Sequence, residues 1–134
     1  MLLPTDVVVA PEASASAPRQ VVAVDQAPAN GMILDIGPQT THRYEQAVES
    51  AGTVIWNGPL GLFEVEPFAA GTRALAAAVG HCPGTTIVGG GDSIAAIEQA
   101  GLGSRITHIS TGGGASLEFL GGRTLPGVAA LADR

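Results

Sequence analysis

The sequence predicts an α/β fold with a doubly wound parallel sheet, in the Rossmann-like arrangement of a sheet between two helix layers. First, short apolar and β-branched runs alternate along the chain with stretches of helical spacing, the pattern of strand–helix–strand units. Second, two of these runs, residues 85–88 and 106–109, are followed by glycine triplets at 89–91 and 112–114. A strand, a glycine turn and a helix start form an anion site, because backbone N–H groups and the helix dipole converge there.

The predicted strands are the β-branched apolar runs that are bounded by turn residues. In order along the chain they span residues 7–9, 20–24, 32–36, 53–56, 85–88 and 106–109. Such strands, alternating with helices, are expected to be parallel, so that their carboxyl ends lie at one edge of the sheet. The polar or glycine-rich loops 57–64, 89–93 and 110–114 therefore mark the expected ligand site.

Five helices are predicted from the apolar spacing and from residues that start or stop helices. Thr40 or Thr41 is expected to cap the first, which runs to about residue 50. Pro67 opens the second, which continues to about residue 79, because proline fits the first turn of a helix. The remaining helices are expected at 92–100, 115–120 and 127–132, the last opened by a proline.

Composition excludes several classes of protein. The 134 residues suit one domain or part of a larger one, and the net charge of −6 argues against a nucleic-acid surface. No apolar run is as long as a membrane span, and the chain start lacks a basic region and reaches Asp6 at once. The single Cys82 excludes an internal disulfide. These features predict a soluble, cytoplasmic protein that binds neither nucleic acid nor membrane.

The basic residues are all arginine, and the chain contains no lysine. Phosphotransferase sites set a cation against the transferred phosphoryl group, and a Walker A loop requires Gly-Lys-Ser/Thr. The composition therefore excludes a Walker A loop and argues against a self-sufficient phosphotransferase.

The segment from Gly89 to Ser93 is the first candidate site. Gly90 and Gly91 would let phosphate oxygens approach the backbone, and Asp92 could bind Mg²⁺ directly or through water. The Ser93 hydroxyl could donate to a phosphate. The alternative is a turn between strand and helix in which glycine only relieves crowding.

Two further segments follow strands in the same way. Residues 111–116 carry the second glycine triplet but do not match Gly-x-Gly-x-x-Gly, so a dinucleotide site lacks its fingerprint. In residues 56–64, Asn57, an apolar loop and Glu64 could hold a nucleoside, with the carboxylate accepting from ribose hydroxyls. The alternative places Trp56 and Phe63 in the core and Glu64 in solvent.

Other reactive side chains form no recognisable constellation. The three histidines have neither metal-ligand spacing nor a Ser/His/Asp arrangement, and they are expected at surface or structural positions. Cys82, between a histidine and a proline, is expected to be an ordinary thiol.

With these motifs, the sequence resembles the carboxyl-terminal part of phosphoglycerate kinases. Six blocks occur in the order and spacing of that family: 3–10 (LPTDVVVA), 34–38 (LDIGP), 56–59 with 63–64 (WNGP, FE), 89–93 (GGGDS), 110–116 (STGGGAS) and 125–128 (LPGV). The resemblance implies reversible phosphoryl transfer between 1,3-bisphosphoglycerate and Mg-ADP, giving 3-phosphoglycerate and ATP in glycolysis. It also implies two doubly wound domains joined by a hinge, which close on the substrates and exclude water.

The resemblance assigns roles to individual positions. It implies a nucleotide site with Mg²⁺ bound by Asp92 and a phosphate segment that includes Ser93. It implies that fixed N–H donors of the second glycine triplet face the phosphoryl group in transit. The implied nucleotide-binding residues are Glu64, Asn57, Pro59, Leu62, Leu34, Gly90, Gly91, Asp92 and Ser93, and the implied catalytic residues are Gly112, Gly113 and Gly114.

The resemblance covers about the last third of the family pattern. It therefore implies that residues 1–134 form a partial nucleotide-binding domain, truncated at its amino-terminal side, without the glycerate-binding domain. Little or no kinase activity is expected from this chain by itself. Unpaired sheet edges and an exposed apolar side of the last helix (Val128, Leu131) predict self-association. The alternative is a stand-alone, non-catalytic module that binds nucleotide or serves a structural role.

Overall fold

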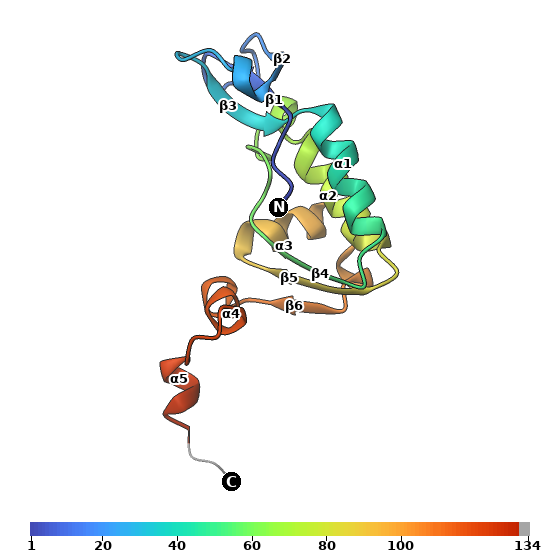
Figure 1. The fold of residues 1–134 in the computed structure, drawn as a ribbon, viewed down its shortest axis with the longest axis vertical. Helices are drawn as coiled ribbons and strands as arrows, with labels where there is room; N and C mark the ends of the chain where they lie inside the picture. The colour runs from blue at the N-terminus through green and yellow to red at the C-terminus, as the bar shows by residue number, and fades with distance from the viewer. Residues whose placement is uncertain (132–134) are drawn as a thin grey trace.

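The structure, a computed structural model, describes residues 1–131. Figure 1 shows an elongated arrangement of three parts, with a small antiparallel sheet at one end and two short helices at the other. A parallel sheet and three longer helices lie between these ends. Within residues 1–131, no helix combines the length and the apolar character needed to cross a membrane.

The first sheet contains β1 (Asp6–Ala10), β2 (Gln20–Ala23) and β3 (Met32–Ile36) in the order β2-β1-β3. Both strand pairs are antiparallel, so the expectation of parallel pairing is wrong for these three strands. The connecting segments explain the difference. Residues 11–19, which join the neighbours β1 and β2, contain no helix, whereas parallel neighbours need a longer crossover. Residues 24–31, with the 3₁₀ turn η1 (Val24–Gln26), then lead to β3 on the other side of β1.

The second sheet confirms the predicted α/β class. Strands β4 (Thr53–Asn57), β5 (Thr85–Gly89) and β6 (His108–Ser110) are parallel, in the order β4-β5-β6. They are joined by α2 (Ala70–His81) and α3 (Gly91–Gln99), with 3₁₀ turns η2 (Glu66–Phe68) and η3 (Gly103–Arg105).

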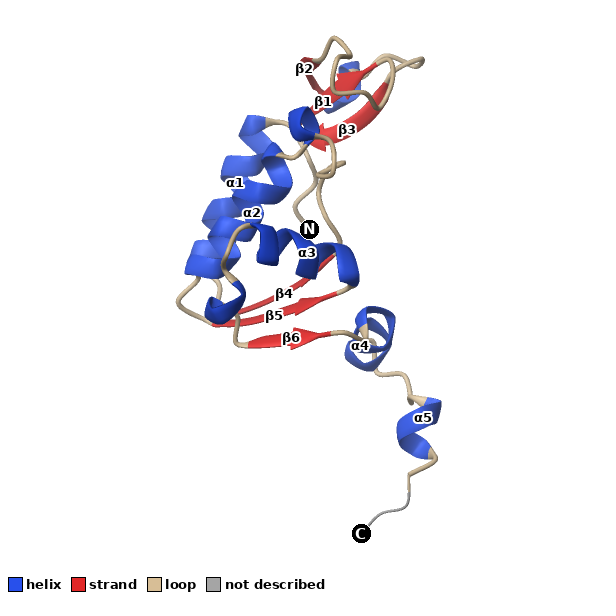
Figure 2. Ribbon diagram, turned by 180° about the vertical axis from the view of Figure 1, so that it is seen from behind, coloured by secondary structure: helices blue, strands red, loops and turns tan. Residues whose placement is uncertain are grey.

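Helices cover one face of this parallel sheet among the described residues (Figure 2). On the other face Ile55 is 43% exposed, and its register neighbours are Ile87 and the exposed His108. Parallel sheets are ordinarily covered on both faces, so residues 1–131 show two of the three expected layers.

Helix α1 (Pro38–Glu49) begins earlier than predicted. Its N-cap is Gly37, and Thr40 lies inside the first turn and is buried, so neither Thr40 nor Thr41 is the cap. The carboxylate of Asp6 from β1 takes that role, accepting hydrogen bonds from the backbone N–H groups of Gln39 and Thr40. The capping side chain belongs to β1, which is distant from α1 in the sequence, so the residues next to the helix give no signal of this cap.

The last two helices project from the body (Figure 1). Helix α4 (Gly113–Leu120) and helix α5 (Pro126–Ala129) contain no buried residue. The predicted final helix ends earlier than expected, and its last position, 132, lies outside the described residues. The predicted exposure of Val128 and Leu131 is confirmed.

Two groups of buried side chains form the core. The larger packs β4, β5 and β6 against α2 and α3, and its members are Trp56, Phe63, Ala69, Leu75, Ala76, Val79, Val88, Ala96, Ile97 and Ile106. The smaller contains Ala10, Ala17, Leu34 and Phe68, with Leu62 packed against it. The segment 57–64 therefore lies between the two groups and is anchored to both.

Candidate functional site

The three predicted loops meet at the carboxyl ends of β4, β5 and β6. Asn57, Gly89 and Ser110 are register neighbours at these ends. The Asn57 side chain donates from Nδ2 to the carbonyl oxygen of Gly113 at 3.1 Å. The backbone N–H of Gly58 donates to Ser93 Oγ at 2.6 Å. These bonds link the loop after each strand to its neighbours, as the parallel pairing predicts.

Glycine allows two of the loops to touch. A Cβ on Gly113 would lie 2.8 Å from Gly90 Cα, which is closer than a side chain tolerates. Gly90 itself has a φ of +86°, a conformation that favours glycine. By contrast, open space surrounds Gly91 and Gly114. Crowding thus explains glycine at Gly113, while the open positions leave backbone that a ligand could approach.

Two helix starts face the same region. Helix α3 begins at Gly91 and helix α4 at Gly113, and neither N-cap residue supplies a side-chain hydrogen bond. The first N–H groups of a helix lack partners within the helix, and the dipole adds positive potential there. The two adjacent starts can therefore accommodate the oxygens of a phosphate chain.

The polar residues of the first turn of α3 divide between solvent and interior. Asp92 is exposed, whereas Ser93 is buried and its hydroxyl accepts the Gly58 N–H. A contact between Ser93 and phosphate therefore stays a prediction. No cluster of three or more His, Cys, Asp or Glu side chains suited to a metal occurs in the described part. A Mg²⁺ ion held by Asp92 would draw its other ligands from nucleotide phosphates and water, as Mg²⁺ commonly does.

A mainly apolar cavity of about 360 Å³ lies beside the loops, and Asp35 is the one charged residue among the described residues that line it. Its lining includes all three predicted wall residues, Leu34, Pro59 and Leu62. Leu62 N donates to the carbonyl oxygen of Leu34 at 2.8 Å, which joins β3 to the loop. Glu64 follows the cavity-lining segment at an exposed position and does not line the cavity. The structure thus brings the three predicted apolar residues together in one cavity. The carboxylate of Glu64 lies outside the cavity, two residues after Leu62 in the sequence.

Sequence reasoning missed the role of Asp35, which is buried in β3. Its Oδ2 accepts the Gly71 N–H at 2.8 Å and its Oδ1 accepts the Ile36 N–H at 2.9 Å. Burial raises the pKa of Asp35 because it disfavours the charged carboxylate, although these hydrogen bonds oppose that rise. The available signal was a carboxylate within an apolar strand.

Thr72 was also missed. Its hydroxyl oxygen accepts the N–H groups of Leu60 and Gly61, at 3.1 Å and 3.2 Å. Thr72 lies on the buried side of α2, where a polar residue is an indication of an interior hydrogen bond.

The remaining candidates lie elsewhere. Trp56 and Phe63 are buried in the core, as the structural alternative expected. All three histidines are exposed, and Cys82 is half-buried with Sγ 3.4 Å from the carbonyl oxygen of Val48.

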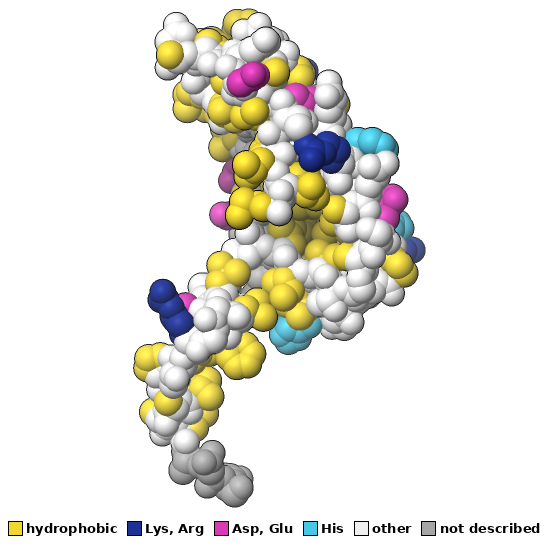
Figure 3. All heavy atoms as spheres, viewed as in Figure 1, with side chains coloured by type: hydrophobic (Ala, Val, Ile, Leu, Met, Phe, Trp, Pro, Cys, Tyr) yellow, Lys and Arg dark blue, Asp and Glu magenta, His cyan; other side chains and the backbone are white. Residues whose placement is uncertain are grey.

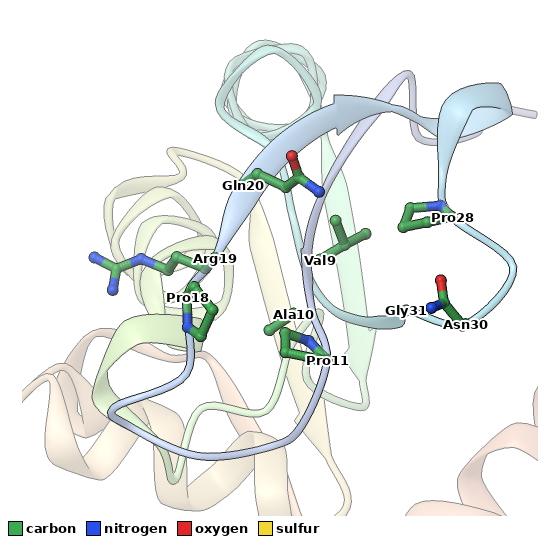
Figure 4. Close-up of a pocket in the computed structure, with 9 residues that line it drawn as sticks. All are labelled: Val9, Ala10, Pro11, Pro18, Arg19, Gln20, Pro28, Asn30 and Gly31. Atoms are coloured by element: carbon green, nitrogen blue, oxygen red, sulfur yellow. The ribbon is translucent and has the colours of Figure 1, made fainter.

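A second cavity of about 410 Å³ lies at the antiparallel sheet (Figure 4). Its lining is mainly proline and small apolar side chains, and the guanidinium of Arg19 points away from the other lining residues. Its other polar side chains are the neutral amides of Gln20 and Asn30, so no charged group of the described lining is directed at a ligand there.

Comparisons with known proteins give one family. The family model for phosphoglycerate kinase matches residues 1–123. The phosphoglycerate kinase of Roseiflexus sp. (strain RS-1) is 62% identical over 132 residues, which cover 98% of this chain and 33% of that protein. The phosphoglycerate kinase of Moorella thermoacetica is 60% identical over 134 residues, covering 100% of this chain and 34% of that protein.

Solved structures agree. The structure of phosphoglycerate kinase from Coxiella burnetii matches with a TM-score of 0.88 and 46% identity, covering 96% of this chain and 33% of that chain. The enzyme from Pyrococcus horikoshii OT3 matches with a TM-score of 0.79 and 37% identity, covering 96% and 31% respectively. The chain thus spans about a third of the length of the relatives that it matches.

Proposed function

This chain belongs to the phosphoglycerate kinase family, and we propose from that premise that residues 1–134 are part of a carboxyl-terminal, nucleotide-binding domain of such an enzyme. The observation that supports this function most strongly is the meeting of three loops at the carboxyl ends of β4, β5 and β6, beside an apolar cavity. Ligands of open α/β sheets bind at that edge.

The proposed reaction of the whole enzyme is reversible phosphoryl transfer between 1,3-bisphosphoglycerate and Mg-ADP, giving 3-phosphoglycerate and ATP. It is a phosphotransferase reaction in glycolysis with a carboxyl group as acceptor, and it would take place in the cytoplasm. The glycerate substrates would need the amino-terminal domain of the enzyme. Such transfer depends on positioning and on stabilising charge rather than on a protein nucleophile.

Within this chain, each part of the nucleotide has a proposed place. The base occupies the cavity walled by Leu34, Pro59 and Leu62, and Glu64 accepts hydrogen bonds from the ribose. The phosphates lie at the start of α3, with Mg²⁺ on Asp92. Glycines 112–114 present N–H donors at the start of α4 to the phosphoryl group in transit.

The chain by itself is expected to lack turnover. It contains no lysine, and the exposed Arg73 is engaged with Glu66, with 2.7 Å between Arg73 Nη1 and Glu66 Oε1. None of the arginines within residues 1–131 lines the cavity beside the loops. The cation that phosphoryl transfer requires is therefore not a lysine of this chain, and we expect another part of the enzyme to supply it.

Mg-ADP is expected to bind saturably to the chain, and binding should weaken at least about tenfold in Glu64→Ala and in Asp92→Ala. A loss of about 1.5–3 kcal/mol is typical when a hydrogen bond or contact to a charged group is removed, which is about tenfold or more in affinity. Isothermal titration calorimetry of Mg-ADP into each folded variant measures the effect. Glu98→Ala, an exposed carboxylate at the other end of α3, is the matched control and should bind like the unaltered chain.

Equal affinity in all four proteins would contradict the assigned roles of Glu64 and Asp92. No saturable binding by the folded, unaltered chain would contradict a nucleotide site assembled from residues 1–134 alone.

The absence of lysine also favours a second candidate, a stand-alone module that binds nucleotide without catalysis. Fusion of the amino-terminal two-thirds of a relative to this chain distinguishes the two. ATP formation from 1,3-bisphosphoglycerate by the fusion would support the enzyme, and a folded but inactive fusion would support the module.

Self-association is the expected partner interaction. Figure 3 shows hydrophobic side chains along α4 and α5, and the large exposed ones at this end are Leu117, Phe119, Leu120, Val128 and Leu131. Contiguous apolar surface of this kind favours association. Light scattering should show a mass that rises with concentration and falls back in Phe119→Ser, while Leu3→Ser, exposed at the other terminus, leaves it unchanged. A clean monomer at high concentration would contradict the proposal.

A further inference from the structure

We propose that Thr72 is a positioning residue for nucleotide binding: its buried hydroxyl holds the loop of residues 58–61 in the shape that forms one wall of the cavity. This inference rests on the proposed nucleotide function. Thr72 does not line that cavity, so it would act through the loop rather than by contact with the ligand.

Two buried hydroxyl groups satisfy all backbone donors of the loop. Thr72 in α2 is 0% exposed and accepts from Leu60 N and Gly61 N. Ser93 in α3 accepts from Gly58 N. The fourth residue, Pro59, has no N–H to donate. The loop therefore makes no backbone donor bond within itself, and its conformation depends on side chains of two helices.

Asp35, which lines the same cavity, packs closely against this loop. A Cβ on Gly61 would lie 2.3 Å from Asp35 Oδ1 and 2.6 Å from the carbonyl oxygen of Phe68, so the loop backbone is tightly packed there. Asp35 also accepts the N–H of Gly71, the residue before Thr72. The start of α2 thus holds β3 through Gly71 and the loop through Thr72, which fixes the distance between the cavity walls.

This arrangement assigns the two hydroxyls to different parts of the nucleotide. The Thr72 bonds end at Leu60 and Gly61, which line the apolar cavity. The Ser93 bond lies in the turn that carries Asp92, at the proposed phosphate position. Loss of the Thr72 acceptor should therefore weaken binding of the nucleoside part and leave binding of the phosphate part unchanged.

Thr72→Val tests this assignment because valine keeps the shape of threonine and removes the acceptor. Amide hydrogen exchange at Leu60 and Gly61 should accelerate about fivefold or more, as expected for loss of an interior hydrogen bond. The dissociation constant of Mg-ADP should rise about fivefold, while that of Mg-pyrophosphate stays within about twofold. Thr72→Ser, which restores the hydroxyl, should return both quantities toward the values of the unaltered chain.

Thr86→Val is the matched control. Thr86 is a buried threonine whose hydroxyl accepts the Thr107 N–H at 3.1 Å, near the opposite end of β5. The Thr86→Val variant loses the same kind of hydrogen bond as Thr72→Val and should destabilise the chain similarly. It should change neither the amide exchange at Leu60 nor the affinity for Mg-ADP.

Several outcomes would overturn the inference. Unchanged exchange at Leu60 and Gly61 in Thr72→Val would show that the hydroxyl does not hold the loop. Faster exchange with unchanged Mg-ADP affinity would show that the loop shape does not matter to the nucleotide, and an equal loss for Mg-pyrophosphate would show a merely structural effect. If the unaltered chain binds no Mg-ADP, a nucleotide site assembled from residues 1–134 alone fails together with this role, and the exchange data report separately whether Thr72 holds the loop.

Discussion

Replacing Phe68 by alanine is expected to lower the free energy of unfolding by about 3–5 kcal/mol, the usual cost of removing a buried phenyl ring. Phe68 is 0% exposed and is the largest side chain of the smaller core group. Its neighbours there include Leu34, and Leu62 packs against the same group. The other buried members include two alanines, Ala10 and Ala17, which are too small to fill the space that the ring would leave.

Urea denaturation followed by circular dichroism measures this effect. Phe119→Ala is the matched control, because Phe119 is 68% exposed in α4 and its truncation should change stability by no more than about 0.5 kcal/mol. Both variants are compared at a dilution at which light scattering shows a monomer. A loss below about 1 kcal/mol in Phe68→Ala would contradict the packing of the smaller group.

The same variant tests whether the two core groups unfold together. Trp56, the single tryptophan, belongs to the larger group, so its fluorescence reports on the parallel sheet. The loop 58–61 and α2 connect the two groups through the bonds of Thr72 and Asp35. We therefore expect the fluorescence transition to move with the circular dichroism transition, as in two-state unfolding. A fluorescence midpoint that stays unchanged would show that the sheets unfold separately.

Strand positions could be predicted from the sequence because β-branched runs are a local property. The third predicted strand, residues 32–36, coincides with β3, and the fifth differs from β5 by one residue. Pairing is not local in this way. The parallel expectation rests on the alternation of strands and helices along the chain, but the segment that joins β1 to its antiparallel partner β2 is short and contains no helix.

In the candidate site, too, some features could be predicted from the sequence and others depend on contacts between distant residues. Gly90, Asn57 and Gly113 were placed correctly at the sheet edge because parallel topology brings strand ends together. Thr72 and Asp35 could not be assigned, because their partners lie 11–12 and 36 residues away. A threonine in a helix has no local feature that reveals an acceptor for a distant loop. Side chains that bind a ligand leave a motif, whereas those that hold the motif in place depend on tertiary contacts.

Replacing Asp6 by asparagine is expected to cost about 1–3 kcal/mol of stability near neutral pH, the range for hydrogen bonds to a charged group. Asp6 is the first residue of β1, and its buried carboxylate lies against the first turn of α1. Its Oδ1 accepts from Thr40 N at 2.7 Å and from Thr40 Oγ1 at 2.6 Å, and its Oδ2 accepts from Gln39 N at 3.0 Å. An asparagine would turn an NH₂ group toward one of these donors.

The cost should depend on pH. Burial by itself raises the pKa of Asp6, but the hydrogen bonds from Thr40 and Gln39 outweigh it and hold the pKa below its usual value. A carboxyl whose pKa is lowered by folding contributes stability above its unfolded pKa of about 3.9, and this contribution is lost as the pH falls through the folded pKa. Asparagine does not titrate, so the difference between the two proteins should shrink in the same interval.

Urea midpoints of both proteins, measured from about pH 7 to about pH 3, give this difference directly. Comparing the two proteins matters because Asp35 acts in the opposite direction: its raised pKa adds stability at low pH that is lost as the pH rises through the folded value. Asp35 is present in both proteins, so its contribution cancels in the difference. Asp25→Asn, at an exposed position in η1, should show no loss of stability at any pH. A difference between Asp6→Asn and the unaltered chain that stays constant down to pH 3 would contradict a charged Asp6 as the cap of α1.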